Sequence, residues 1–412
     1  MTLSLSRPEG FEGGVSLHPK ATGEKSKGAP EKYLRETQNF LGQKATQWPQ
    51  GVIIAGGGTG GHVFTGLAIA QELKRLQPTG QILFVGSRSG LEARAIPQAG
   101  FPLSCIGVSG LKGKPWWRKV SALARAGWAV CRALWFVYRF RPGVVLGVGG
   151  YAGGPVVLAA WLLRIPTAIC EPNSVPGLTN RLLKPFVKRV YGGFRNSMRW
   201  FDAKRFVLTG IPLRSDLRRA RAPAPSTSNK PVRVLILGGS QGARALNQAV
   251  PTALGLLRQH NVRLHVTHQS GAADHAEVEQ AYARHGLTHV RVAPFIDDIA
   301  AAYAACDLLI ARAGAGTCAE IAQVGAVTIL IPLPTAADDH QTHNALELAN
   351  VNAAAHLLQQ DLTPQRLSQL MLDLIRDPQR RAKMQQAARR QAQPNAAEHI
   401  ARDLMRLANK SR

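Results

Sequence analysis

Short apolar runs and longer amphipathic stretches alternate along the chain from residue 51 onward. The runs "GVIIAGGG", "QILFVGS", "GVVLGVG" and "PTAIC" have the pattern of buried strands, and helical patterns lie between them. The alternation starts again at "VRVLILGGSQGAR" and continues through "RLHVTHQSG", "VRVAPFI", "DLLIARAGAGT" and "VTILIPLP". Because strands that alternate with helices form parallel sheets covered by helices, the sequence predicts an α/β fold with two similar nucleotide-binding halves.

Changes in composition divide the chain into five segments. Residues 1–50 are rich in Gly, Pro, Ser, Lys and Glu and lack the apolar stretch of a secretory signal, so we expect a disordered extension. Residues 51–217 are expected to form the first domain and residues 232–394 the second, with the Pro- and Ser-rich segment 218–231 as the linker. We expect the last helix, within residues 395–412, to pack back on the first domain.

The longest uncharged run, residues 142–163, reaches the length of a membrane span. Gly and Pro interrupt it throughout, so we interpret it as a buried strand that leads into a helix.

The balance of charged residues is strongly basic. The 412 residues include 51 Lys and Arg against 25 Asp and Glu, a formal net charge of +26. This excess indicates a polyanionic partner, an anionic membrane surface or phosphorylated substrates. The five cysteines have no CxxC spacing and indicate reduced thiols of a cytosolic protein rather than disulfides or a zinc site: Cys105, Cys131, Cys170, Cys306 and Cys318.

Three glycine-rich turns, at residues 56–61, 238–242 and 314–317, each follow an apolar run and open a helix. Glycine permits a close approach of the backbone, and the N-terminus of a helix attracts phosphate. None of the turns matches GxxxxGK[ST], which disfavours an ATPase-type loop, whereas a GxGxxG reading from Gly56 keeps a dinucleotide enzyme open. Glu320, near the start of the helix that follows the third glycine turn, is a candidate for binding both ribose hydroxyls or for stabilising a helix N-terminus.

The segment from Ala93 to Cys170 contains no Asp or Glu. Within it, residues 112–141 combine eight Lys and Arg with four tryptophans, the composition of a helix that lies in an anionic membrane interface. The candidate membrane contacts are Trp116, Trp117, Arg118 and Lys119. A core-facing helix with a solvated basic side is the alternative, and nucleic acid ranks behind both because no nucleic-acid-binding motif accompanies the charge.

Several polar residues follow predicted strands and are candidates for chemistry. His62 comes directly after the first glycine turn and can act as a general base or cap its helix. Glu171 is the only acid between Glu92 and Asp202 and is either a site residue or half of an ion pair. Arg214 can meet a phosphate. His340, Gln341, His343 and Asn344 form a polar cluster, and its neutral amides suit the hydroxyls of a sugar better than a metal.

Nine motifs in one order resemble the MurG family of N-acetylglucosaminyltransferases, over about residues 51–405: "GGGTGGHVFTGLAIA", "SGLKGKP", "GVGGYAGGP", "EPNSVPGLTN", "GIPLR", "GGSQGAR", "FIDD", "RAGAGTCAEI" and "DHQTHNA". The resemblance implies a GT-B fold, two Rossmann-like domains that face each other across a cleft. It also implies transfer of N-acetylglucosamine from UDP-GlcNAc to the 4-hydroxyl of undecaprenyl-linked lipid I, with inversion, to give lipid II in peptidoglycan synthesis. The enzyme would work at the cytoplasmic face of the inner membrane as a peripheral protein.

The same resemblance implies roles for individual residues. The histidine matched by His62 is a proposed base or acceptor-positioning group, and Glu171 is the second candidate for the base. No obligatory metal or other cofactor is expected, because N–H groups and Arg can neutralise the diphosphate. The implied substrate-binding residues are Thr59, Gly60, Gly61, Asn173, Arg214, Ser240, Ile296, Ala315, Gly316, Thr317, Cys318, Ala319, Glu320 and Gln341.

The sequence departs from many members of the family at two places. Cys170 and Pro172 flank Glu171 where relatives have His and Gln, and Ile211 stands where relatives have Asn, so no role is expected for these three positions. Two alternatives stay open at this point. One is another UDP-sugar enzyme of the same fold, such as a UDP-GlcNAc epimerase or a glycolipid transferase, and the other is a basic nucleotide- or nucleic-acid-binding protein.

Overall fold

The computed structural model describes residues 51–88, 90–106, 116–225, 230–239, 241–287 and 289–409, and within residues 116–126 it describes the backbone alone. The predicted disordered extension, residues 1–50, lies outside the described residues. So do Ser240 and the side chains of Trp116, Trp117, Arg118 and Lys119.

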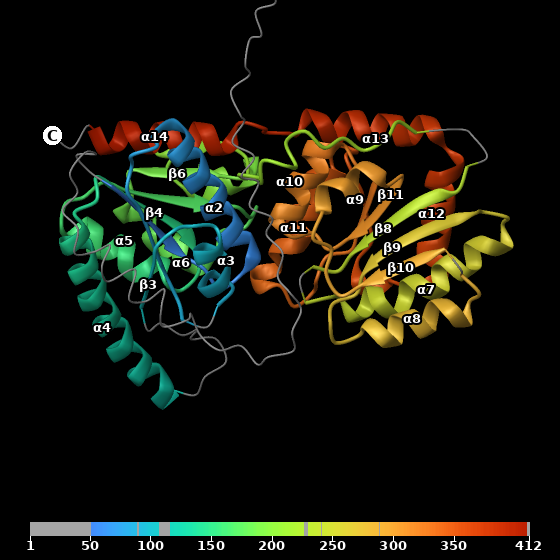
Figure 1. Cartoon of the computed structure of the whole chain (residues 1–412), viewed down its shortest axis with the longest axis horizontal. Helices are drawn as coiled ribbons and strands as arrows, with labels where there is room; N and C mark the ends of the chain where they lie inside the picture. The colour runs from blue at the N-terminus through green and yellow to red at the C-terminus, as the bar shows by residue number, and fades with distance from the viewer. Residues whose placement is uncertain are drawn as a thin grey trace, which may run out of the picture.

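The described chain folds into two lobes that lie side by side, each built on one parallel sheet (Figure 1). The first sheet has the strand order β3-β2-β1-β4-β5-β6-β7 and the second has the order β10-β9-β8-β11-β12-β13. In each sheet the order reverses beside the first strand, which is the doubly wound arrangement that places ligands at the carboxyl ends of the strands. Two parallel sheets covered by helices confirm the predicted α/β class.

The first lobe contains strands β1 (Val52–Gly56), β2 (Ile82–Gly86), β3 (Leu103–Cys105), β4 (Val144–Gly149), β5 (Thr167–Glu171), β6 (Arg189–Gly192) and β7 (Phe206–Leu208). Its helices are α2 (Gly60–Leu76), α3 (Glu92–Gln98), α4 (Trp116–Phe140), α5 (Gly153–Leu162) and α6 (Leu178–Leu183), with 3-10 turns η1 (Lys184–Phe186) and η2 (Arg195–Trp200).

The second lobe contains strands β8 (Val232–Leu237), β9 (Leu264–Gln269), β10 (Val290–Ala293), β11 (Leu308–Ala311), β12 (Thr328–Leu330) and β13 (Ala355–His356). Its helices are α7 (Arg244–Gln259), α8 (His275–Arg284), α9 (Ile299–Ala305), α10 (Ala315–Val324), α11 (His340–Ala349), α12 (Pro364–Arg376) and α13 (Pro378–Arg390), with 3-10 turns η3 (Ala337–Asp339) and η4 (Gln359–Asp361). Helix α14 (Ala396–Asn409) follows.

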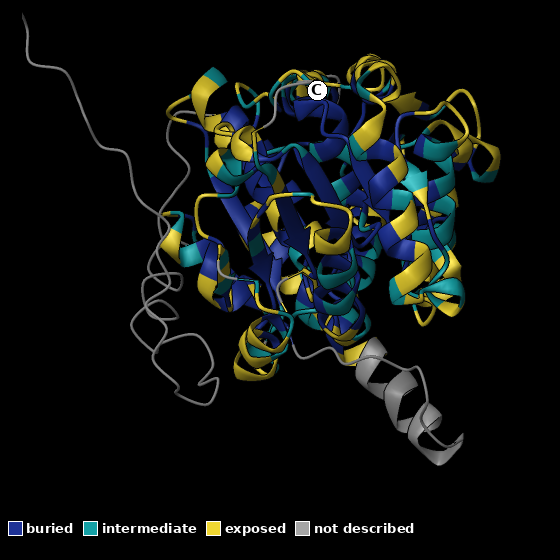
Figure 2. Cartoon of the chain, turned by 90° about the vertical axis from the view of Figure 1, so that its right-hand side faces the viewer, coloured by how far each residue is buried: buried dark blue, intermediate teal, exposed yellow. Residues whose placement is uncertain are grey.

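The strands are drawn largely as buried in Figure 2. Each sheet is buried on both faces, and successive residues of one strand enter different cores. Ile54 of β1 packs in the core under α2 and α14, whereas Ile53 packs with Phe136 of α4 in the opposite core. In the second lobe Ile236 and Leu235 of β8 divide in the same way. This burial explains why the strands have continuous apolar runs rather than an alternating pattern.

The chain crosses between the lobes twice. Within the predicted linker, Ala222 is buried against the second lobe and its N–H donates to the carbonyl of Val324 at 2.9 Å. After α13 the chain returns to the first lobe, where Ile400 and Leu404 of α14 are completely buried in the core over α2. The first lobe is therefore completed by the end of the chain.

The uncharged run at residues 142–163 is β4 followed by α5, a strand and a helix as the sequence analysis interpreted it. No helix in the described part of the chain combines the length and the apolar character needed to cross a membrane.

Candidate active site

The first glycine-rich turn joins β1 to α2 at the carboxyl end of the first sheet. Gly56, Gly57 and Gly58 have φ angles of 149°, 151° and 88°, which glycine adopts without steric cost. A Cβ on Gly57 would collide with the carboxylate of Glu92. No side chain caps α2, so its first N–H groups are left for a ligand at this end of the sheet.

Glu92 stabilises this turn through hydrogen bonds. Its carboxylate is almost completely buried and accepts hydrogen bonds from the N–H of Gly58 at 2.9 Å, the N–H of Ser87 at 3.1 Å and the hydroxyl of Ser87 at 2.6 Å. A buried carboxylate is costly unless it is hydrogen-bonded, and these three donors offset that cost. Glu92 therefore fixes the conformation of the turn that precedes His62.

His62 lies half-buried in the first turn of α2, and its Nδ1 is 3.0 Å from the hydroxyl of Thr59. The ring lies over Gly149, where an added Cβ would come within 2.6 Å of Nε2. Burial lowers the pKa of His62, the backbone of Gly57 opposes this shift, and the charge of His340 from the second lobe adds to it. A histidine that is neutral near pH 7 can accept a proton.

Glu171 ends β5 and is almost completely buried. Its Oε1 accepts from the N–H and the side-chain amide of Asn173 at 2.9 and 3.3 Å, and its Oε2 accepts from the N–H of Gly177 at 3.1 Å and the amide of Asn180 at 2.8 Å. Burial raises the pKa of Glu171, and these hydrogen bonds oppose the shift. Both oxygen atoms of Glu171 are therefore occupied by donors of the loop after β5 and of α6 (Leu178–Leu183).

The second glycine turn follows β8 in the other lobe. Gly239 and Gly242 have φ angles of 86° and 79°. Gln269 connects this turn to a neighbouring loop, because its amide donates to the carbonyl of Gly239 at 2.8 Å and its oxygen accepts from the N–H of Ile296 at 3.1 Å. The resemblance to the MurG family implied a substrate-binding role for Ile296, which we interpret as a contact of its backbone with the base of the nucleotide. Since its N–H is already bonded, only its carbonyl oxygen is left for a base.

The third turn leads into α10. Gly314 precedes this helix in an extended conformation, and the first N–H bonded within the helix is that of Cys318, which donates to Gly314 at 2.9 Å. The N–H groups of Ala315, Gly316 and Thr317 thus have no acceptor inside the helix. They provide the arrangement that binds phosphate at a helix N-terminus.

Glu320 lies one turn further along α10, and its carboxylate accepts a hydrogen bond from the hydroxyl of Tyr303 at 2.9 Å. Burial raises its pKa to about 7, which the bond from Tyr303 and the charge of Arg214 oppose. Arg214 itself pairs with Asp216 at 2.7 Å. Glu320 and Arg214, two of the predicted nucleotide-binding residues, therefore lie close enough for the charge of Arg214 to lower the pKa of Glu320.

Helix α11 and helix α10 face the first lobe. At the start of α11, the side-chain oxygen of Gln341 accepts from the N–H of Leu333 at 3.0 Å. Cys318 and Ala319 of α10 line a pocket of about 330 Å³ at the junction of the lobes, together with Ile211 of the first lobe. Cys318 and Ala319, two of the predicted substrate-binding residues, therefore lie where the two lobes meet.

Helix α4 has two different faces in its described part. Ala133, Phe136 and Val137 are buried in the first lobe, as a core-facing helix requires. On the outer face Trp128, Trp135 and Tyr138 are more than half exposed, and an arginine lies over two of these rings: Arg132 over Trp128 at 5.3 Å and Arg141 over Tyr138 at 5.8 Å. One face of α4 therefore packs in the core, which was the alternative to a membrane contact, while the opposite face exposes aromatic rings and arginines.

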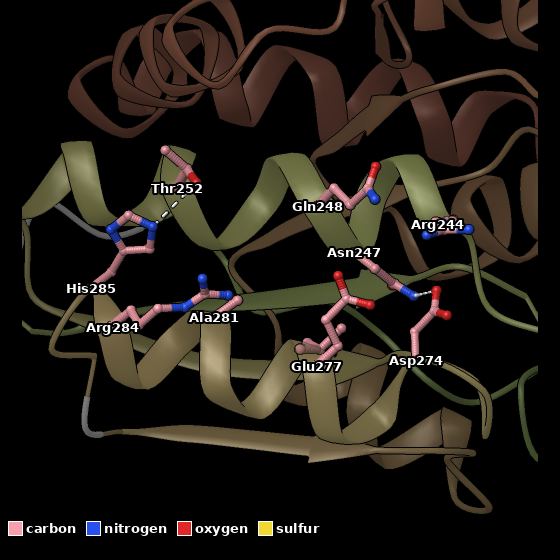
Figure 3. A pocket seen from close by; sticks show the side chains of 10 residues that line it. Arg244, Asn247, Gln248, Thr252, Asp274, Glu277, Ala281, Arg284 and His285 are labelled. Atoms are coloured by element: carbon pink, nitrogen blue, oxygen red, sulfur yellow. Dashed lines mark hydrogen bonds between the residues drawn. The ribbon is translucent and has the colours of Figure 1, made fainter.

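A separate pocket lies between α7 and α8 on the second lobe (Figure 3). The amide of Asn247 donates to Asp274 at 2.8 Å, and the hydroxyl of Thr252 is 3.1 Å from the ring of His285. Its lining carries both cations and carboxylates, so it does not offer the concentrated positive field that a diphosphate needs.

Two family models match the two lobes in order. Residues 52–192 match the glycosyltransferase family 28 N-terminal domain, and residues 233–400 match its C-terminal domain. A curated relative from Anaeromyxobacter sp. (strain K) is 44% identical over 359 residues, which cover 87% of this chain and 93% of the relative. That relative is named UDP-N-acetylglucosamine–N-acetylmuramyl-(pentapeptide) pyrophosphoryl-undecaprenol N-acetylglucosamine transferase. The crystal structure of MurG from Acinetobacter baumannii aligns with a TM-score of 0.72 at 35% identity, covering 87% of this chain and all of that one.

This chain belongs to the MurG family. The match confirms the predicted glycosyltransferase class and the GT-B fold. A UDP-GlcNAc 2-epimerase from Neisseria meningitidis also aligns, with a TM-score of 0.59 over 86% of this chain and 99% of that chain, but at 10% identity. That likeness shows a shared fold alone.

Two residues of this MurG-family site, Glu92 and Gln269, were not predicted as site residues, and both stabilise the glycine turns. Asn344 of α11 was predicted within the polar cluster of Gln341, but its contact with the first lobe was not. For Glu92 a signal was present, because it is the last acid before the acid-free segment. The contacts of Gln269 and Asn344 join segments that are far apart in the sequence.

Proposed function

We propose that this chain transfers N-acetylglucosamine from UDP-GlcNAc to the 4-hydroxyl of undecaprenyl-diphospho-N-acetylmuramoyl-pentapeptide, with inversion at the anomeric carbon. The observation that carries the proposal is the 44% identity to a transferase of that name over 93% of its length. The match includes both lobes, so it covers donor and acceptor sites together.

In the proposed reaction the acceptor hydroxyl attacks the anomeric carbon of the donor sugar. The bond between that carbon and the diphosphate breaks, and UDP leaves with the bonding electron pair. His62 accepts the proton of the attacking hydroxyl, for which its lowered pKa keeps the imidazole neutral. Glu171 holds loop 172–177, so that Asn173 is positioned for the sugar or the acceptor.

We assign the departing UDP to the second lobe. The free N–H groups at the start of α10 and the guanidinium of Arg214 stabilise the diphosphate, and Glu320 binds the ribose hydroxyls. Gln341 keeps its amide NH₂ for the hydroxyls of N-acetylglucosamine, because its oxygen holds the backbone of Leu333. On this account the chemistry needs no metal ion, and activity should persist in EDTA.

We further propose that the outer face of α4 places the enzyme on the cytoplasmic surface of the inner membrane. Trp128, Trp135 and Tyr138 would lie at the depth of the lipid headgroups, and neighbouring arginines would contact anionic lipid. This orientation brings the first lobe, which we assign to the acceptor, to the surface that carries the lipid.

The test is the dependence of UDP release on the acceptor. The purified chain is incubated with UDP-GlcNAc, with and without the lipid-linked muramyl pentapeptide, and UDP is measured. We expect rapid release only with the acceptor, and much less with His62→Ala. Conversion of UDP-GlcNAc without any acceptor would contradict the proposal and favour an epimerase.

A further inference from the structure

Helix α11 presents one face to the first lobe. Asn344 and Glu347 are three residues apart, which places them on the same face of a helix. Glu347 accepts from the hydroxyl of Ser174 at 3.0 Å and from the N–H of Asn196 at 3.1 Å. Just before the helix, Asp338 forms an ion pair with Arg181. The second lobe therefore contacts the loop after β5 mainly through α11 and the turn that precedes it.

Asn344 is at the centre of this contact and is completely buried. Its side-chain oxygen accepts from the N–H of Ser174 at 2.9 Å. Its amide donates to the carbonyl of Ala313 at 3.2 Å and to the side-chain oxygen of Asn173 at 3.3 Å. An asparagine amide has two N–H donors, and both are used.

The three partners of Asn344 belong to different parts of the proposed site. Ala313 directly precedes Gly314 and the turn that leads into α10, where we assign the diphosphate. Asn173 and Ser174 belong to the loop that Glu171 organises in the first lobe. One buried amide thus joins the donor turn of one lobe to the acceptor-side loop of the other.

We propose that Asn344 is a positioning residue that couples occupancy of the donor site to the conformation of the loop that carries Asn173. The inference rests on the proposed function and adds to it a specific route between the two substrates. When the donor fixes the turn after Ala313, it also fixes the amide that holds Asn173. Coupling of this kind makes each substrate bind more tightly when the other is present.

The experiment measures the affinity for a short-chain, lipid-linked muramyl pentapeptide with and without saturating UDP. In the wild-type chain we expect UDP to tighten acceptor binding about 5-fold or more. In Asn344→Asp a carboxylate faces two oxygen acceptors, so we expect the ratio of the two affinities to fall to about one and kcat to fall about 10-fold or more. Binding of UDP alone should stay within about 3-fold of wild type.

Matched variants separate coupling from loss of structure. Asn350→Asp changes an exposed asparagine at the end of the same helix and should keep the wild-type ratio. Glu347→Ala should weaken the coupling, whereas Glu347→Gln, which keeps an accepting oxygen, should restore it. If Asn344→Asp does not fold, as judged by thermal melting, the Glu347 pair decides the question.

Two kinds of failure can be told apart. A wild-type chain that binds neither UDP nor the acceptor contradicts the proposed function itself. A wild-type chain that shows coupling, together with an Asn344→Asp variant that retains it, overturns the role of Asn344 and leaves the proposed function in place. Retained coupling in Glu347→Ala overturns it equally if Asn344→Asp cannot be folded.

Discussion

Burial shifts the pKa values of His62 and Glu320 in the directions that their proposed roles require. The pKa of His62 is lowered from 6.5, so the imidazole is neutral near pH 7. The pKa of Glu320 is raised to about 7, so its carboxylate gains its charge near neutral pH. In the roles we propose, proton acceptance by His62 and binding of ribose hydroxyls by Glu320, each group must be deprotonated.

The protonation of His62 predicts the acidic limit of activity. Because its pKa is lowered from 6.5, kcat at saturating UDP-GlcNAc should stay constant as pH falls to that value and decline only below it. His62→Ala should reduce kcat by about 100- to 10,000-fold and remove this acidic limit, while UDP binding is kept. The check is a pH profile of kcat at saturating UDP-GlcNAc, with the exposed His399→Ala as control. Near-normal turnover of His62→Ala would show that another group takes the proton.

Glu320 predicts a pH dependence of donor binding. Its carboxylate is protonated below its pKa of about 7, so the affinity for UDP-GlcNAc should rise as the pH passes upward through that value. Calorimetric titration with UDP-GlcNAc on either side of that pH measures the change. Glu320→Gln should bind the donor more weakly and remove the pH dependence, whereas the exposed Glu279→Gln on α8 should preserve both. A pH-dependent affinity in Glu320→Gln would assign the effect to another group.

At the level of elements, the alternation of apolar runs and helical patterns was sufficient to predict the two sheets. Each strand is buried on both faces, so its residues are apolar without interruption, and this pattern is local in the sequence. The glycine turns could be predicted as well, because positions such as Gly57 and Gly242 need backbone angles that other residues rarely adopt. The supports of those turns could not. Gln269 joins the loops of Gly239 and Ile296, and only the folded sheet brings these loops together.

Helix α4 carries a prediction at this level. Replacing Trp128, Trp135 and Tyr138 by Ser should lower binding to liposomes that contain anionic lipid, because these aromatic rings are exposed and lie beside arginines. Turnover of a soluble acceptor should not change, since the buried face of the helix is intact. Replacing Trp116, Trp117, Arg118 and Lys119 is expected to act in the same way. Binding to vesicles is measured by co-sedimentation.

The exposed Val351→Ser on the second lobe is the control for this experiment, and it should not alter liposome binding. If the α4 variant partitions as the wild type does, α4 is not the membrane contact. Stronger competition from DNA or RNA than from anionic lipid would instead favour a nucleic-acid partner.

At the scale of the whole molecule, the two lobes form one enzyme because the chain joins them more than once. The predicted linker is attached to the second lobe at Ala222, which is buried there. The C-terminal helix packs in the core of the first lobe, where Tyr191 of β6 donates to Asp403 at 3.0 Å. Asn344, Glu347 and Arg181 contact the opposite lobe, and their partners there are more than 150 residues away along the chain. No local pattern reports such contacts, and this is why the sequence predicted the lobes but not what holds them together.

The central claim is that both substrates meet between these lobes and that a sugar passes from one to the other. Mass spectrometry of the lipid product after incubation with UDP-GlcNAc and the lipid-linked muramyl pentapeptide tests it most directly. The account predicts an acceptor whose mass has increased by that of one N-acetylglucosamine residue, with one UDP released for each product. An unmodified lipid acceptor, with UDP-GlcNAc either unchanged or converted to another sugar nucleotide, would contradict it.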